Sequence, residues 1–152
     1  MERIPIKIKR LDHNPDLPLP RYETEGSSGM DIRAAVDGPV ILNPGEVKLI
    51  PTGFAISIPP GYEGQVRPRS GLALRHGVGM VNSPGTIDSD YRGEVSIVMI
   101  NWGQMPFTIK RGDRIAQMVI GKAYRAELVD INDSSLDATI RGAGGFGHSG
   151  IG

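Results

Sequence analysis

The hydrophobic pattern of the chain consists of short runs in which apolar and polar residues alternate. Alternation with a period of two is typical of strands that bury one face. Residues 94–102 differ, because the middle of this segment is apolar on both faces, and it is predicted to form a central strand covered on both sides. Turn-forming residues such as Pro59-Pro60-Gly61 separate the runs. In chain order the predicted strands are 4–8, 54–58, 94–102, 107–109, 114–120 and 126–131.

One short helix is predicted after Arg69. Ser70 is a suitable N-cap, Leu72–Arg75 favours helix propagation, and Gly77 stands where a C-terminal glycine belongs. Neither an internal repeat nor a change of composition marks a second domain. The pattern therefore predicts one mostly β domain with a single short helix.

Glycine and proline content supports the β prediction. The 152 residues include 21 Gly and 12 Pro, well above the roughly 12% that average usage gives for the two together. Most stretches between these residues are too short for a helix, and Lys122–Arg141 is the exception.

Charge and cysteine content exclude several classes of protein. Lys and Arg number 17 and Asp and Glu number 17, so no overall positive field exists to coat a nucleic acid. The absence of Cys excludes disulfides, thiolate metal sites and a Cys nucleophile. His13, His76 and His148 lack zinc-site spacing, and Walker and dinucleotide fingerprints are absent. Without an apolar run of ~18 residues or a signal-peptide core, we expect a soluble cytoplasmic protein with no membrane partner.

Four segments carry residues that suit catalysis or ligand binding, and each has a plainer interpretation. Residues 68–72 offer an arginine and a hydroxyl to an anion, or are simply a capped helix start. Residues 85–93 hold a candidate general base and an aromatic wall, or form a solvated hairpin. Gln117 lies on a strand face with apolar neighbours and needs a partner, either a strand or a ligand. Asp31 follows a flexible turn and orients a water or metal, or caps that turn.

The glycine-rich tail from Arg141 to Gly152 cannot bury enough surface to fold alone. One interpretation is a disordered end, as for most such termini. The other is an arm that orders around phosphates, because glycines let successive N–H groups converge on an anion and Arg141 adds charge.

Five motifs containing these residues follow one another along the chain. They are SGMDIRAA around Asp31, PRSGL from Pro68, GTIDSDYRGE from Gly85, GDRIAQ from Gly112 and RGAGGFGHSG from Arg141. Their order and combination resemble the motif series of the trimeric deoxyuridine 5'-triphosphate nucleotidohydrolases (dUTPases). The dCTP deaminases share the fold of that family but differ around the third motif and lack the arginine-led glycine tail.

The resemblance implies an all-β fold, a distorted antiparallel β-barrel with jelly-roll character. It implies a barrel domain at 1–140 and a flexible arm at 141–152. It also implies a homotrimer with three sites at subunit interfaces, where the arm of one chain closes over a site built by the other two.

The resemblance also implies roles for individual residues. Asp88 matches the water-activating aspartate, Tyr91 the ring beneath deoxyribose, and Phe146 the ring that lies on uracil. Mg²⁺ is expected as cofactor, bound to phosphates and waters, with Asp31 acting from outside its first ligand shell and no direct protein ligand. The expected substrate-binding residues are Arg69, Ser70, Gly71, Asn82, Gly85, Thr86, Ile87, Tyr91, Met99, Gln117, Arg141, Gly145, Phe146, Gly147, His148 and Ser149.

The implied activity is a Mg²⁺-dependent cleavage of dUTP to dUMP and diphosphate, which keeps uracil out of DNA and supplies dUMP for thymidylate synthesis. Two alternatives remain open at this stage. One is a dCTP deaminase, alone or combined with dUTP cleavage, and the other is a nucleotide-binding or regulatory protein without turnover.

Overall fold

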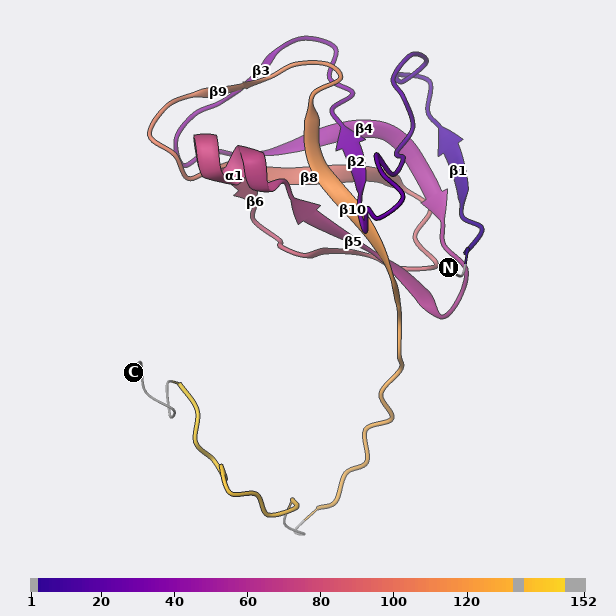
Figure 1. The fold of residues 1–152 in the computed structure, drawn as a ribbon, viewed down its shortest axis with the longest axis vertical. Coiled ribbons are helices and arrows are strands. Elements are labelled where there is room, and N and C mark those ends of the chain that lie inside the picture. The colour runs from indigo at the N-terminus through magenta and orange to yellow at the C-terminus, as the bar shows by residue number, and fades with distance from the viewer. Residues whose placement is uncertain (1–2, 133–135, 147–152) are drawn as a thin grey trace.

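The computed structural model describes residues 3–132 and 136–146 of the chain (Figure 1). Within these residues no helix is both long and apolar enough to cross a membrane. The described elements are β1 (Lys7–Arg10), β2 (Met30–Arg33), β3 (Val40–Leu42), β4 (Val47–Ser57), β5 (Tyr62–Pro68), α1 (Ser70–His76), β6 (Val78–Met80), β7 (Gly85–Ile87), β8 (Glu94–Asn101), β9 (Phe107–Ile109) and β10 (Arg114–Lys122).

The strands pair antiparallel in three sheets. Two sheets have four strands each, in the orders β1-β4-β8-β6 and β2-β10-β5-β7, and β3 pairs with β9. The expected all-β fold with one short helix is confirmed, although the described strands do not close into one continuous barrel.

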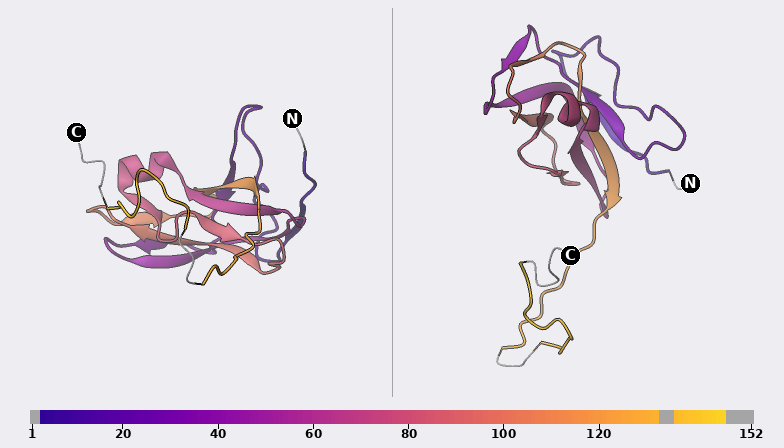
Figure 2. Two further views of the ribbon diagram at one scale, coloured as in Figure 1. Left: turned by 90° about the horizontal axis from the view of Figure 1, so that it is seen from below. Right: turned by 60° about the vertical axis from the view of Figure 1, so that its left-hand side comes forward.

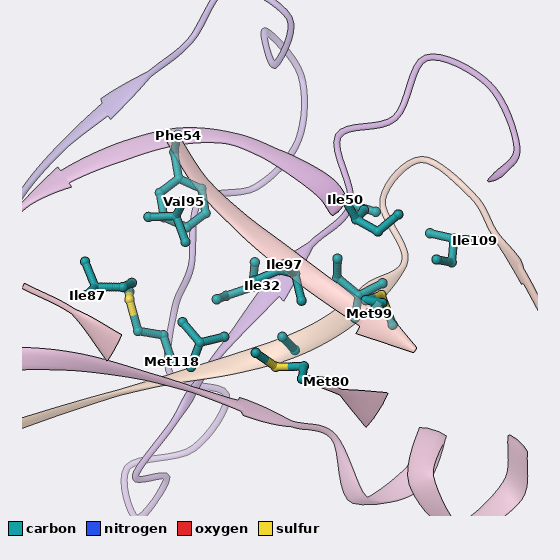
Figure 3. Close-up of a cluster of buried hydrophobic side chains, with 14 of the residues drawn as sticks. Ile32, Ile50, Phe54, Met80, Ile87, Val95, Ile97, Met99, Ile109 and Met118 are labelled. Carbon is teal, nitrogen blue, oxygen red and sulfur yellow. The ribbon is translucent and has the colours of Figure 1, made fainter. Parts of the chain in front are cut away.

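The hydrophobic core combines side chains from both four-stranded sheets. Ile97 and Met99 of β8 contribute from the first sheet, and Ile32 and Met118 contribute from the second. Figure 3 shows these side chains gathered in one cluster. Burial of such groups at about 25 cal/mol per Å² is what holds the two sheets together.

Strand β8 is central in its sheet, as predicted, but only one of its faces is fully covered. Val95, Ile97 and Met99 are buried, whereas the alternate residues from Glu94 to Ile100 are half-buried. On that second face the pairing brings Leu49, whose exposed fraction is 65%, opposite Val98. The expected covering of both faces is therefore wrong for the single chain.

The first and the last of the predicted strands are not formed as expected. The first begins at Lys7 rather than at residue 4, which places it after Pro5, a residue that cannot donate to a strand ladder. No strand forms at residues 126–131 within the described chain, because this segment leaves the sheets after β10 and has no strand beside it (Figures 1 and 2). Leu128 and Val129 are exposed there as a result.

The helix forms where it was predicted but is capped differently at its start. Arg69, not Ser70, is the N-cap residue, and no side chain caps the helix there. At the other end Gly77 adopts the left-handed conformation with φ of 66°, and its N–H donates to Ala73 O, as expected. The chain thereby turns directly from α1 into β6.

Candidate functional site

Asp31 is the centre of a charged cluster formed by three elements. Its side chain on β2 is largely buried, with 17% exposed, and ion-pairs with Arg69 Nε at 2.9 Å and with Arg114 Nη1 at 3.1 Å. Arg69 follows β5 and Arg114 begins β10, so the carboxylate joins the ends of two strands that pair with each other. Two guanidinium groups against one carboxylate leave the cluster with one net positive charge.

Gln117 lies beside this cluster because it pairs with Asp31 in the register of β10 and β2. Its Nε2 donates to Pro68 O at 3.1 Å, so the partner that the sequence left open is a neighbouring strand. Its Oε1 lies against Gly29, where an added Cβ would come within 2.6 Å of that oxygen. A glycine at position 29 is thus what leaves room for the carboxamide.

A groove of about 380 Å³ opens next to the cluster, between α1 and the segment that leads into β10. Arg69, Lys110 and Arg114 line it and give it positive charge, with Asp113 as an acidic neighbour. Ser70 and Gly71 lie exposed in the first turn of α1, directly after Arg69. Three of the predicted phosphate-binding residues, Arg69, Ser70 and Gly71, therefore lie together beside one positively charged groove.

The second group of predicted residues lies on the hairpin that follows β7. The Asp88 carboxylate is exposed and has no hydrogen-bond or ion-pair partner among residues 3–132 and 136–146. The loop is tightened by Tyr91 N, which donates to Asp88 O at 3.2 Å. Arg92 Nη1 donates to Ser89 O at 2.7 Å and to Tyr91 O at 2.8 Å. The Tyr91 hydroxyl donates to the carbonyl of Glu94 at 2.9 Å. The Tyr91 side chain stays partly exposed.

Strand β7 lies at the edge of its sheet, paired only with β5 among the described strands. Gly85 and Ile87 are buried, whereas Thr86 is exposed. Asn82 is exposed just before the strand, with its Nδ2 near Gly85. The open side of β7 therefore offers backbone donors and acceptors beside a carboxamide.

Met99 does not join this group. Its side chain is fully buried in the core and β8 pairs it with Met80 of β6. The structure consequently places it behind the segment that carries Asn82 rather than at an open surface.

The hairpin and the charged cluster lie toward opposite ends of β5. Ile87 pairs with Gly64, whereas Arg69 follows Pro68, and four residues of strand span roughly 13 Å at ~3.3 Å per residue. Strands β5 and β7 are antiparallel. From the paired residues Gly64 and Ile87, the chain therefore runs one way to Asp88 and the opposite way to Arg69. In one chain Asp88 and Arg69 therefore do not converge on a single point.

The glycine-rich arm is described only in part. Arg141 Nε donates to Gly144 O at 2.7 Å, and the side chains of Ile140 and Phe146 are fully exposed. Gly145 is exposed as well. Figure 1 and the right view of Figure 2 show this segment lying apart from the sheets. The predicted residues Gly147, His148 and Ser149 lie outside the described residues.

A dUTPase family model matches residues 16–150 of the chain, which contain both groups of site residues. The chain belongs to the dUTPase family. A deoxyuridine 5'-triphosphate nucleotidohydrolase of Anaeromyxobacter sp. (strain Fw109-5) is 62% identical over 148 residues, covering 97% of this chain and 98% of that protein. The corresponding protein of Caldanaerobacter subterraneus subsp. tengcongensis is 55% identical, with 97% and 99% covered. The chain is thus a dUTPase enzyme, a hydrolase of nucleotide metabolism.

Solved dUTPase structures agree with this fold. A dUTPase variant of Staphylococcus bacteriophage 80alpha with dUpNHpp superposes with a TM-score of 0.85 at 27% identity, covering 97% of this chain and 99% of that one. A dUTPase variant from phage phi11 of S. aureus, described with a structural Mg(II) ion, gives a TM-score of 0.76 at 25% identity, with 85% and 97% covered.

Sequence reasoning did not single out Arg114, Gly29 or Glu94, although all three contact predicted site residues. Each stands inside one of the five motifs, but its residue type alone does not mark it, because a charged residue at the first position of a strand and a glycine in a turn are common. Pairing of distant strands brings Gly29 and Arg114 to the site, whereas Glu94 meets Tyr91 within one hairpin.

Proposed function

We propose that the chain is a dUTP diphosphatase, which hydrolyses the α–β phosphoanhydride bond of dUTP and releases dUMP and diphosphate. The observation that carries this proposal is the Asp88 carboxylate, exposed directly after the edge strand β7 and without a partner in the described part of the chain. Family membership indicates the substrate, and Asp88 supplies an acceptor for the proton of an attacking water.

In this mechanism Asp88 orients a water for in-line attack on the α-phosphorus and takes up its proton. The electron pair of the broken P–O bond leaves with diphosphate. A carboxylate is a weak base at neutral pH, so positioning of the water and neutralisation of phosphate charge supply much of the rate. Asp31 is unsuited to the same task, because two arginines already hold it.

The charged cluster is the proposed triphosphate site. Arg69, Ser70 and Gly71 grip phosphate oxygens, and Gln117 contacts the α-phosphate. The ion pair with Asp31 keeps the Arg69 guanidinium in place before the substrate arrives, which lowers the entropy cost of binding.

The hairpin is the proposed site of the nucleoside. The open edge of β7 (Gly85–Ile87) and the Asn82 amide hold uracil, and Tyr91 lies beneath deoxyribose, where it leaves no room for a 2′-hydroxyl. Cytosine is rejected because its amino group meets backbone donors and leaves them unpaired. Thymine is rejected because its 5-methyl group collides with the hairpin. Met99 supports this region from the core through its pairing with Met80.

We further propose a homotrimer in which each site combines groups from different chains. The separation of Asp88 from Arg69 along β5 supports this, since the two need a common substrate and do not converge within one chain. The arm then closes over a neighbouring site, with Arg141 and the amides of Gly145, Gly147, His148 and Ser149 toward the γ-phosphate and Phe146 on uracil. Exposed arm residues such as Phe146 leave the arm available for another chain.

Mg²⁺ is the proposed cofactor. The described residues contain no group of three or more His, Asp or Glu side chains that could hold a metal ion. An ion carried by the triphosphate and its waters would not need such a group, and Asp31 would face it from outside. Bound in that way, the ion offsets phosphate charge and fixes phosphate geometry.

The proposed activity limits the incorporation of uracil into DNA and provides dUMP for thymidylate synthesis. Such a role places the enzyme in the cytoplasm with the deoxynucleotide pool. Neither a membrane nor a nucleic acid is a direct partner in this proposal.

A nucleotide panel tests the proposal. Diphosphate release is measured with dUTP, UTP, dTTP and dCTP, each with Mg²⁺ and with a chelator. We expect turnover of dUTP alone and its strong reduction by the chelator. Ammonia release from dCTP would instead establish a deaminase, and binding of dUTP without any diphosphate release would establish a nucleotide-binding protein.

A further inference from the structure

Glu94, the first residue of β8, has a side chain that the proposed mechanism does not use. Its Oε1 accepts hydrogen bonds from Gly53 N at 2.7 Å and from Thr52 N at 3.2 Å. The same oxygen lies 2.8 Å from Nε2 of His13. The carboxylate is only 26% exposed. Its contacts join the start of β8 to β4 and to the N-terminal loop.

The register of the two strands explains why a carboxylate is needed at this position. Pro51 pairs with Ser96 and Ala55 pairs with Glu94, so residues 52–54 of β4 bulge opposite the single residue Val95. The N–H groups of such a bulge lose their partners in the ladder. Glu94 replaces the missing acceptor for two of them, which fixes the end of the hairpin against β4.

The backbone of Glu94 also holds Tyr91. The Tyr91 hydroxyl donates to the Glu94 carbonyl at 2.9 Å, and the ring folds back over Gly93. An added Cβ at Gly93 would lie 2.6 Å from Cζ of that ring and closer still to its hydroxyl oxygen. The ring can adopt this position only because residue 93 has no side chain.

We propose that Glu94 and Gly93 are positioning residues that set the preference of the enzyme for a 2′-deoxyribose. The carboxylate of Glu94 fixes the start of β8, its carbonyl fixes the Tyr91 hydroxyl, and Gly93 provides the space for the ring. This inference rests on the proposed function, in which Tyr91 lies beneath the sugar. A ring that moves away from Gly93 opens room for the 2′-hydroxyl of UTP.

The quantity that tests this inference is kcat/KM for dUTP divided by kcat/KM for UTP. We expect Glu94→Ala and Gly93→Ala each to lower this ratio by about tenfold or more, because displacements near 1 Å at a site change rates on that scale. Glu94→Gln should retain most of the ratio, since its amide oxygen still accepts from Thr52 N and Gly53 N.

Glu46→Ala is the matched control. Glu46 is another carboxylate that accepts a backbone hydrogen bond, from Asn43 N at 2.9 Å, but it precedes β4 at the end far from Gly53. Its loss should lower thermal stability while the ratio of the two substrates stays unchanged. An equal fall of the ratio in Glu46→Ala would show a general effect of stability and overturn the inference.

Tyr91→Ala distinguishes a wrong role for Tyr91 from wrong positioning roles for Gly93 and Glu94. If Tyr91→Ala discriminates between dUTP and UTP as the parent does, the proposed role of Tyr91 is wrong and the inference falls with it. If Tyr91→Ala loses discrimination while Gly93→Ala and Glu94→Ala keep it, only the positioning roles are overturned. Should Glu94→Ala fail to fold, Gly93→Ala decides, because its change is confined to the exposed hairpin.

Discussion

At the scale of single residues, Asp31 and Asp88 show how surroundings separate two chemically identical groups. Asp31 is held by Arg69 and Arg114 and is mostly buried, so its lone pairs are committed to the two guanidinium groups. Asp88 is exposed on a short turn. We therefore assign proton uptake to Asp88 and the alignment of Arg69 to Asp31.

Replacement of Asp88 by Asn tests this assignment of proton uptake to Asp88. Asp88→Asn should bind a non-hydrolysable dUTP analogue within a few-fold of the parent affinity, because size and shape are kept. Its kcat should fall by about 10³-fold, the scale of a lost general base. Single-turnover kinetics and calorimetric titration measure the two quantities.

Asp90→Asn is the control for that experiment, because Asp90 is an exposed carboxylate of the same hairpin. It should retain kcat. Parent-like turnover by Asp88→Asn would remove Asp88 from the mechanism.

At the scale of elements, the arm after Ile140 and the body of the fold are energetically separate. The described arm residues hydrogen-bond to one another and to Thr139 just before the arm, and Phe146 is fully exposed. Ordering such a segment costs roughly 1–2 kcal/mol per residue, which contacts with a triphosphate must offset.

Truncation after Ile140 should consequently leave stability and oligomeric state unchanged while kcat/KM for dUTP falls by about 10²-fold. Thermal unfolding, light scattering and diphosphate release measure these outcomes. A chain shortened only by residues 151–152 keeps the RGAGGFGHSG motif and should stay active. An active truncation product would show that the arm has no part in turnover.

Sequence reasoning succeeded for elements whose residues carry a local pattern. Gly77 ends α1 as its position predicted, and the alternation at residues 54–58 marks the end of β4. It failed where a strand depends on a partner, since residues 126–131 have strand-like side chains but no neighbouring strand in the described chain. The ion pairs of Asp31 were likewise invisible, because β2, β5 and β10 are far apart in sequence.

At the scale of the whole molecule, the proposed site requires more than one copy of the chain. The hairpin group and the charged cluster lie toward opposite ends of β5, so neither alone brings a water and a gripped phosphate together. Val47 and Leu49 of β4 are exposed apolar residues beside the half-covered face of β8, and they offer surface that an assembly can cover.

Mixed oligomers test this arrangement directly. Asp88→Asn and Arg69→Ala should each be nearly inactive, yet coexpression should restore activity at about a quarter of the sites, because each of two contributing chains is intact half of the time. Activity of the unfractionated oligomers measures this recovery. Trimers purified through two different tags all contain both variants and should be active at about one site in three.

The matched control combines Asp88→Asn with Tyr91→Ala, whose lesions lie on the same hairpin. No mixed oligomer then contains an intact hairpin, so activity should not rise above that of Tyr91→Ala alone. Failure of the first pair to recover would place the complete site within one chain.

The position of β7 at a sheet edge bears on how substrate choice can be altered. Every amino acid except proline presents the same main-chain N–H and C=O, so recognition of a base by the main chain of residues 85–87 depends little on which other side chains those residues carry. Redesign toward another pyrimidine would then call for inserted or deleted residues in the loop, which shift the path of the polypeptide itself, rather than for point replacements.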